Sequence, residues 1–212
     1  MTSFALITEG ITDQAVLTAI LQANYIEEPD INEVQPIRDE TDNSRQGNMA
    51  GWEKVLEYCS LEFFAQDFIA NDYVIIQIDT DVAEHPNFGI SLTKNGVDVA
   101  TVDLINNVKD LIATKIGEEN YKKYKDRIIF AISVHSVECW LLPFFINDKK
   151  AASRVKNCED HLARALAKKG LPYIKDFRCY ESLSRDFFKN KSFILAASRN
   201  ESLNIFINSL PQ

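Results

Sequence analysis

The chain has 212 residues, of which 46% are hydrophobic and 25% are charged, with only 7 glycines and 6 prolines. This composition is that of an ordinary globular domain and excludes a disordered, collagen-like or linker-rich chain. The formal net charge of −8 conceals an asymmetry, because residues 1–148 hold 10 basic and 25 acidic residues whereas residues 149–212 hold 13 and 6. An acidic chain binds polyanions poorly unless a cation bridges the two or one face is basic.

Apolar runs and cysteine spacing predict a cytoplasmic protein. The apolar runs, such as Leu141 to Ile146, are far shorter than the roughly 18 residues of a membrane span. No basic segment followed by an apolar one opens the chain, so we expect neither secretion nor membrane association. The cysteines are widely spaced and form no C-x-x-C pair, and we expect four reduced, mostly buried thiols: Cys59, Cys139, Cys158 and Cys179.

The first part of the chain predicts a strand, a tight turn and a helix. Phe4 to Ile7 is an apolar strand that ends at Thr8-Glu9-Gly10. From Ile11 onward apolar residues recur at helical spacing, and Thr12 is a plausible N-cap. The pattern then predicts a weaker strand at 31–37, a polar loop at 38–51 and a helix at 52–69.

Two further apolar strands follow, at Tyr73 to Ile78 and at Ile128 to Ile132. The first ends in Asp79-Thr80-Asp81, and the second leads through Ser133 to Ser136 into another apolar run. Between the two strands we expect a long loop at 82–100 and a helix that Thr101 caps. The rest of the chain, from residue 148 onward, is expected to be mainly helical.

Apolar strands without alternation, separated by amphipathic helices, indicate an α/β fold with a parallel sheet covered on both faces. We expect about four strands, an α/β domain at residues 1–147, and a basic helical extension at residues 148–212 packed on it. Functional groups of such sheets collect beyond the carboxyl ends of the strands. Glu9, Asp79, Asp81 and the segment His135 to Glu138 all occupy that position.

Three acidic side chains are therefore expected to meet at one sheet edge. Asp79 and Asp81 lie where a strand breaks into a loop, and Glu9 follows another strand. Carboxylates placed together repel one another unless a cation neutralises them, and Mg²⁺ or Mn²⁺ needs only one or two of them. The pattern favours a metal site for phosphate chemistry, although solvated caps and turn residues give the same D-x-D spacing.

The acidic motifs after these strands resemble those of a known protein family. Glu9-Gly10-Ile11-Thr12-Asp13 and Asp79-Thr80-Asp81, each after a strand, resemble the TOPRIM domain, a Mg²⁺-dependent phosphoryl-transfer module of topoisomerases, primases and nucleases. The segment Ser133 to Phe145, with Glu138-Cys139-Trp140-Leu141-Leu142, resembles the small stand-alone TOPRIM proteins of bacterial phage-defence loci. The resemblance covers about residues 4–145. It implies a TOPRIM-like (Rossmann-like) fold and a Mg²⁺- or Mn²⁺-dependent nuclease that acts on DNA or RNA.

The resemblance also assigns roles to matching residues. Gly10 would keep the turn tight, and Asp13 would lie in the first turn of the helix, both close to substrate. The resemblance further suggests antiviral defence with an ATPase protein as partner, and a homo-oligomer is compatible with the sequence. The acidic residues would carry the chemistry. Glu9 would be the general base or a metal contact, and Glu138 an extra acid. Asp79 and Asp81 would be the two metal ligands.

Basic residues and histidines complete the candidate site. No Lys or Arg closely follows Asp81, so the cation for the transition state would come from Arg45, Lys94 or the basic C-terminal region. His85, in the long loop, is a candidate contact for metal or phosphate. His135 is either a further contact or a capping residue at the edge of the core.

The alternative to a nuclease is a non-catalytic or partner-inhibited binding module that keeps the same acidic geometry. The absence of a basic residue soon after the D-x-D supports this alternative. A D-x-D phosphohydrolase with Asp79 as nucleophile is a third interpretation, but in those enzymes the motif follows the first strand. No G-x-x-x-x-G-K-[ST] motif is present, so we expect no intrinsic ATP hydrolysis.

Overall fold

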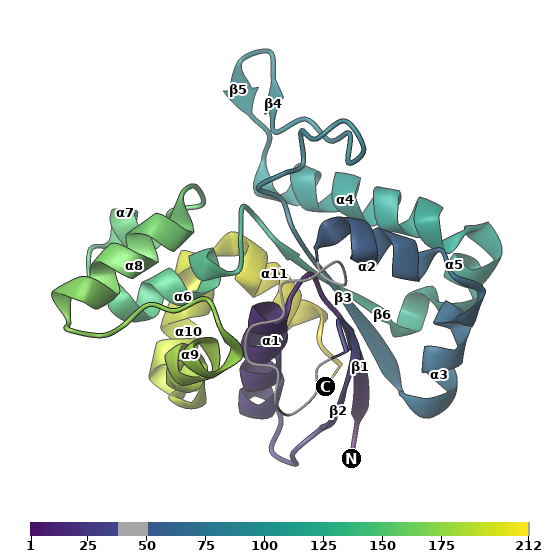
Figure 1. The fold of residues 1–212 in the computed structure, drawn as a ribbon, viewed down its shortest axis with the longest axis horizontal. Helices are drawn as coiled ribbons and strands as arrows, with labels where there is room; N and C mark the ends of the chain where they lie inside the picture. Colours follow the sequence, from purple (N-terminus) through teal and green to yellow (C-terminus); the bar gives the residue numbers. More distant parts are fainter. Residues whose placement is uncertain (38–50, 212) are drawn as a thin grey trace.

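The computed structural model describes residues 1–37 and 51–211 (Figure 1). Its centre is a four-stranded sheet in which all neighbouring strands are parallel, in the order β2-β1-β3-β6. The strands are β1 (Ser3–Ile7), β2 (Asp30–Gln35), β3 (Tyr73–Asp79) and β6 (Ile128–Ser133). The expected α/β class with a parallel sheet of about four strands is therefore confirmed.

Both faces of the sheet are buried, which explains why its strands read as uninterrupted apolar runs. Side chains alternate between two cores, so that Leu6 and Ile75 face one side while Ile7 and Ile76 face the other. On the second side the sheet packs against α2 (Trp52–Cys59) and α4 (Thr101–Ile116). On the first side it packs against α1 (Ile11–Asn24) and α11 (Glu201–Ser209) (Figure 1).

The expectation of one continuous helix at 52–69 is wrong. After α2 the chain forms a 3₁₀ turn, η1 (Glu62–Gln66), and a short helix, α3 (Asp67–Ala70). The break follows Ser60, whose N–H and hydroxyl both donate to the carbonyl of Glu57 and tighten the end of the helix. Phe64 and Phe68 keep the apolar spacing because both still pack into the core beneath these pieces.

Smaller expectations about loops and caps also need correction. Gly10 and Ala100, not Thr12 and Thr101, take the N-cap positions of α1 and α4, with no side-chain cap. The loop expected at 82–100 contains a small antiparallel hairpin, β4 (Thr93–Lys94) and β5 (Val97–Asp98). The loop expected at 38–51 lies outside the described residues except for Gly51. After α4 come α5 (Glu118–Tyr124) and the 3₁₀ turn η2 (Lys125–Arg127).

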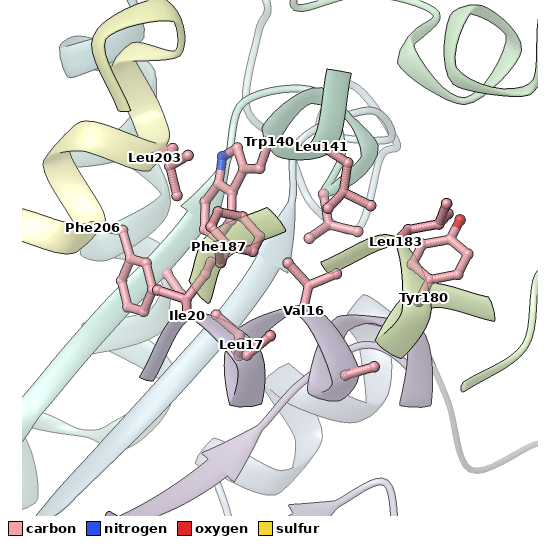
Figure 2. Packing of buried hydrophobic residues seen from close by; sticks show 14 of the residues in the cluster. Val16, Leu17, Ile20, Trp140, Leu141, Tyr180, Leu183, Phe187, Leu203 and Phe206 are labelled. Atoms are coloured by element: carbon pink, nitrogen blue, oxygen red, sulfur yellow. The ribbon is translucent and has the colours of Figure 1, made fainter. Parts of the chain in front are cut away.

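The C-terminal part of the chain is helical, as expected. From residue 148 onward its elements are α7 (Lys149–Ala152), α8 (Cys158–Lys168), α9 (Phe177–Leu183), η3 (Ser184–Phe188), α10 (Asn190–Arg199) and α11, and α6 (Glu138–Phe145) lies directly before them. Their apolar side chains share one core with α1, where Val16 and Leu17 lie among residues of α6, α9 and α11 (Figure 2). Trp140 is fully buried there, stacked on Phe206, and donates its indole N–H to Ser202 Oγ.

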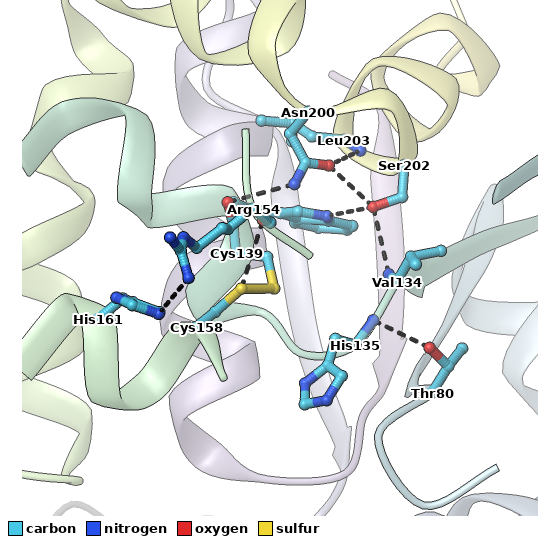
Figure 3. The surroundings of a disulfide bond; sticks show 11 residues. Thr80, Val134, His135, Cys139, Arg154, Cys158, His161, Asn200, Ser202 and Leu203 are labelled. Carbon is cyan, nitrogen blue, oxygen red and sulfur yellow. Dashed lines mark hydrogen bonds between the residues drawn. A yellow bond between two sulfur atoms is a disulfide. The ribbon is translucent and has the colours of Figure 1, made fainter. Parts of the chain in front are cut away.

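Two of the cysteines form a disulfide, which corrects the expectation of four reduced thiols. Cys139 in α6 is bonded to Cys158 at the start of α8, 19 residues further along the chain (Figure 3). The sequence spacing gave no indication of this bond, because only the packing of α8 on α6 brings the two sulfurs together. Cys59 is a free, buried thiol as expected, whereas the free Cys179 is half-exposed.

Reduction of this disulfide is expected to destabilise the protein by about 3 kcal/mol, the effect of releasing a loop of comparable length in the unfolded chain. The melting temperature should fall by about 6 to 12 °C in a phosphine reductant. Cys158→Ser should show the lower value with or without reductant. Cys179→Ser, which removes a free thiol, is the control and should respond to reductant like the wild type. Equal melting temperatures for the oxidised and reduced wild type would contradict this expectation.

Candidate functional site

The candidate site begins where β1 and β3 end side by side. The N–H of Asp79 donates to Glu9 Oε1 at 2.8 Å, so the side chain that follows one strand reaches the last residue of the other. Gln77, buried in β3, accepts from the Glu9 N–H at 3.0 Å and donates to Asp79 Oδ1 at 2.8 Å. The parallel pairing of Ile7 with Ile76 sets this register. Glu9 and Asp79 are therefore brought together at the carboxyl edge of the sheet.

The ends of β3 and β6 are tied by a second set of hydrogen bonds. The N–H groups of Thr80 and Asp81 both donate to the carbonyl of His135 at 2.9 Å. In return the His135 N–H donates to Thr80 Oγ1 at 2.9 Å (Figure 3). His135 has a φ of +70°, a left-handed backbone conformation that residues other than glycine seldom adopt. This turn carries the chain from β6 into α6, which begins at Glu138.

Glu138 and Asp13 extend the acidic group from two helix starts. Glu138 is 2% exposed, and its Oε1 accepts the hydroxyl of Tyr180 from α9. Tyr180 is in turn hydrogen-bonded to the hydroxyl of Tyr173 at 2.7 Å. Asp13 is buried in the first turn of α1, at the amino end of the helix, where a negative charge is favoured.

The pKa values of these carboxyl groups are raised. Burial raises the pKa of Glu9 to about 8, and the charge of Asp13 adds to it although the Asp79 N–H opposes it. Burial and the neighbouring Glu138 raise the pKa of Asp13 to about 7. Burial, with Asp13, Glu9 and Glu138 nearby, holds the pKa of Asp79 well above its usual range. The site therefore concentrates more negative charge than its own cations compensate.

Asp81 occupies a more open position. Partial burial raises its pKa, whereas the adjacent His135 opposes this effect, Glu138 adds to it and Lys175 opposes it. Asp81 is exposed, so its carboxylate faces solvent beside the buried group.

A cleft of about 230 Å³ opens over Asp79, Asp81 and Glu138, whereas Glu9 and Asp13 are not among its lining residues. Its walls come from the end of β3, the turn between β6 and α6, the start of α8 and the segment before α9. The lining residues are Asp79, Asp81, His135, Ser136, Glu138, Asn157, Cys158, Glu159, Asp160 and Lys175. A larger hollow of about 360 Å³ is lined by Phe145 and by residues between Leu171 and Asp186, and it contains none of the residues expected to form the site.

The other expected site residues lie in different places. Gly10 caps α1, and a Cβ there would stand 3.1 Å from Asp13 Oδ2, so the glycine leaves room for that carboxylate. His85 packs against the ring of Trp52, with centroids 5.4 Å apart, and its Nδ1 accepts the N–H of Asn87. Lys94 is exposed in β4. Neither His85 nor Lys94 lines the cleft, and Arg45 lies outside the described residues.

Several residues of the site were not anticipated from the sequence. Gln77 had a detectable signal, because it is the only polar residue inside the apolar run of β3 before Asp79. Lys175, Tyr180 and Glu159 had none. They lie more than 70 residues after Asp81, and only helix packing brings Lys175 and Glu159 to the cleft and Tyr180 to Glu138.

A metal ion would have to be held by few protein ligands. Within residues 1–37 and 51–211, no three His, Cys, Asp or Glu side chains are grouped closely enough to hold an ion among them. The same residues contain no helix with the length and apolar character needed to cross a membrane. Comparison of the chain with protein-family models, with curated proteins and with solved structures finds no match.

Proposed function

We propose that this protein is a metal-dependent nuclease with a TOPRIM-type acidic site, hydrolysing phosphodiester bonds of DNA or RNA. The observation that carries the proposal is the hydrogen bond of the Asp79 N–H to Glu9 Oε1, which ties the Glu9 carboxylate to the backbone of Asp79 across adjacent strands. Asp81 and Glu138 line the same cleft as Asp79. The motif order that resembles TOPRIM proteins thus coincides with one acidic edge, the usual position of functional groups in parallel sheets.

The donor set suits a hard cation such as Mg²⁺ or Mn²⁺. Carboxylate oxygens are the protein ligands that Mg²⁺ prefers, and it uses one or two of them while keeping several waters. Asp79 and Asp81 would be the ligands, so a cluster of three protein ligands is not required. The raised pKa values of Glu9 and Asp79 support a cation here, because a positive charge between these groups would relieve their repulsion.

Each acidic residue has a distinct role in this proposal. A bound Mg²⁺ would stabilise charge that develops at phosphorus and lower the pKa of an attacking water. Glu9, fixed by the Asp79 N–H, would accept the proton of that water or contact the ion through water. Glu138, held by Tyr180, would orient the groups around it on the far wall of the cleft.

A second candidate is a non-catalytic or partner-inhibited module that works with an ATPase. One observation favours it: oxygens of Glu9, Asp79 and Glu138 already accept hydrogen bonds within the protein. Such bonds would also be expected if the acids only held the turns between strands and helices. The two candidates differ in one property, since the module would show no turnover in the absence of its partner.

The test is cleavage by the purified wild type of plasmid DNA and total RNA with Mg²⁺, with Mn²⁺ or with EDTA. We expect one of the two pools to be digested with a metal ion and to remain intact in EDTA. Because the resemblance is to TOPRIM proteins of phage-defence loci, phage DNA and bacterial tRNA are also tested as substrates. A well-folded protein that cleaves none of them with either ion would contradict the nuclease and favour the second candidate.

A further inference from the structure

The acidic cleft needs a cation besides the metal, because a phosphodiester is an anion and must approach several carboxylates. No basic residue follows the D-x-D motif closely in the sequence. Among the described residues that line the cleft, Lys175 is the one lysine or arginine. It belongs to the segment between α8 and α9, in the basic C-terminal part of the chain.

The position of Lys175 is fixed by two glutamates on different elements. Its Nζ lies 3.0 Å from Glu159 Oε2 in α8 and 3.9 Å from Glu138 Oε1 in α6. The side chain is 43% exposed, so its ammonium group lies at the boundary between the buried acids and the solvent in the cleft. Glu138 is itself held by Tyr180, so one of the two carboxylates beside the ammonium group is anchored in the cleft wall.

Lys175 also keeps hydrogen-bonding capacity for a ligand. An ammonium group has three N–H donors, and among the described residues Lys175 makes one hydrogen bond, to Glu159. Lys156 differs, because it lies outside the cleft lining and donates to both carboxylate oxygens of Asp98. Lys175 therefore has donors available toward an anion that lies against Asp79 and Asp81.

We propose that Lys175 is a catalytic residue that contacts a non-bridging oxygen of the scissile phosphate and stabilises its charge in the transition state. This inference rests on the proposed nuclease function and adds the cation that the motif region lacks. The helical C-terminal region would thus complete the site, and not only attract nucleic acid as a basic surface. Of the sources considered from the sequence, the basic C-terminal region would provide this cation through a single residue.

The first test is the cleavage rate of variants with the nucleic acid that the wild type digests. Lys175→Ala is expected to lower kcat about 100-fold, the usual cost of removing one donor to developing charge. Lys175→Arg should recover part of the rate, because it restores the charge with a different shape. Lys122→Ala is the control, since Lys122 is exposed on α5, on the other side of the molecule from α8 and α9 (Figure 1), and should leave kcat unchanged.

The second test measures binding without cleavage. A short fluorescein-labelled oligonucleotide of the digested type is titrated with each protein in Ca²⁺, at several salt concentrations. Loss of one phosphate contact should reduce the slope of log Kobs against log[salt] by about 0.7 to 0.9. Lys175→Ala should show this reduction, and Lys122→Ala should not. Lys175→Gln, which can still hydrogen-bond Glu159, guards against an effect of unfolding and should behave like Lys175→Ala.

The outcomes separate the two proposals. If the wild type cleaves but folded Lys175→Ala and Lys175→Gln keep its kcat and salt slope, the role of Lys175 is wrong and the nuclease stands. If the salt slope changes but kcat at saturation does not, Lys175 only binds nucleic acid and the catalytic proposal is overturned. If the wild type neither binds nor cleaves, both proposals fall.

Discussion

Asp79→Asn is expected to lower metal-dependent cleavage by at least about 1000-fold, as removal of a ligand that positions a catalytic metal ion should. The same substitution is expected to raise the melting temperature of the metal-free protein near pH 8. Asp79 is surrounded by other carboxyl groups, and they hold its pKa well above the usual range together with burial. Removing one negative charge from this group relieves repulsion that the folded protein otherwise sustains.

Asparagine is a suitable replacement because it preserves the local hydrogen bonds. Its side-chain oxygen can still accept from Gln77 Nε2, and its N–H can still donate to Glu9 Oε1. A loss of activity with a higher melting temperature would then report on charge and not on misfolding. Such an exchange of stability for function is common at active sites.

The matched control is Asp126→Asn. Asp126 is exposed in η2, directly before β6, and so lies at the opposite end of the sheet from the cleft. It should leave both the cleavage rate and the melting temperature close to those of the wild type. If Asp79→Asn cleaved at a rate within tenfold of the wild type, Asp79 would not be a metal ligand of a nuclease.

The sheet and its acidic edge could be predicted because both depend on local sequence. Phe4 to Ile7 and Tyr73 to Ile78 are apolar on both faces, and this pattern is specific to strands covered on both sides. Parallel pairing then requires Glu9 and Asp79 to follow the strands at the same edge. The Gln77 bridge that connects their backbone and side chains was not anticipated, although a polar residue inside the apolar run marks it.

The far wall of the cleft could not be predicted, because contacts between distant helices form it. Lys175 reaches Glu138 across 37 positions, and nothing in the spacing of the two residues indicates their proximity. The Cys139–Cys158 disulfide has the same origin, since it depends on how α8 returns to α6. Helix periodicity likewise failed at Ser60, where side-chain bonding to the backbone ended the helix while the apolar spacing continued.

Metal-free protein is expected to lose stability as the pH rises from about 6.5 to 8.5, with the free energy of unfolding falling by about 3 kcal/mol. The pKa of Glu9 is raised from 4.5 to about 8 and that of Asp13 from 3.8 to about 7, mainly by burial. The folded protein therefore holds more protons in this range than the unfolded chain, where both groups are ionised. Stability then decreases with pH until both groups are ionised in the folded state as well.

Urea unfolding in EDTA across this range measures the effect. The range begins above the pKa of about 6 to which burial raises Asp67, a carboxyl group of α3 whose titration would otherwise add to the loss. The double variant Glu9→Gln with Asp13→Asn should remove the part of the pH dependence that these two groups contribute, and it also removes two of the charges that raise the pKa of Asp79. It leaves an amide oxygen at position 9 to accept the Asp79 N–H.

Addition of Mg²⁺ to the wild type should also reduce the pH dependence, because a bound cation stabilises the ionised carboxylates of the folded protein. Proton release and metal binding would then be linked, with tighter binding at higher pH. A free energy of unfolding that is flat or rises between pH 6.5 and 8.5 in EDTA would show that Glu9 and Asp13 are ionised in the folded protein without a cation. If Mg²⁺ leaves the slope of the unfolding free energy against pH unchanged, the buried acids do not take part in metal binding. That result would favour the non-catalytic module.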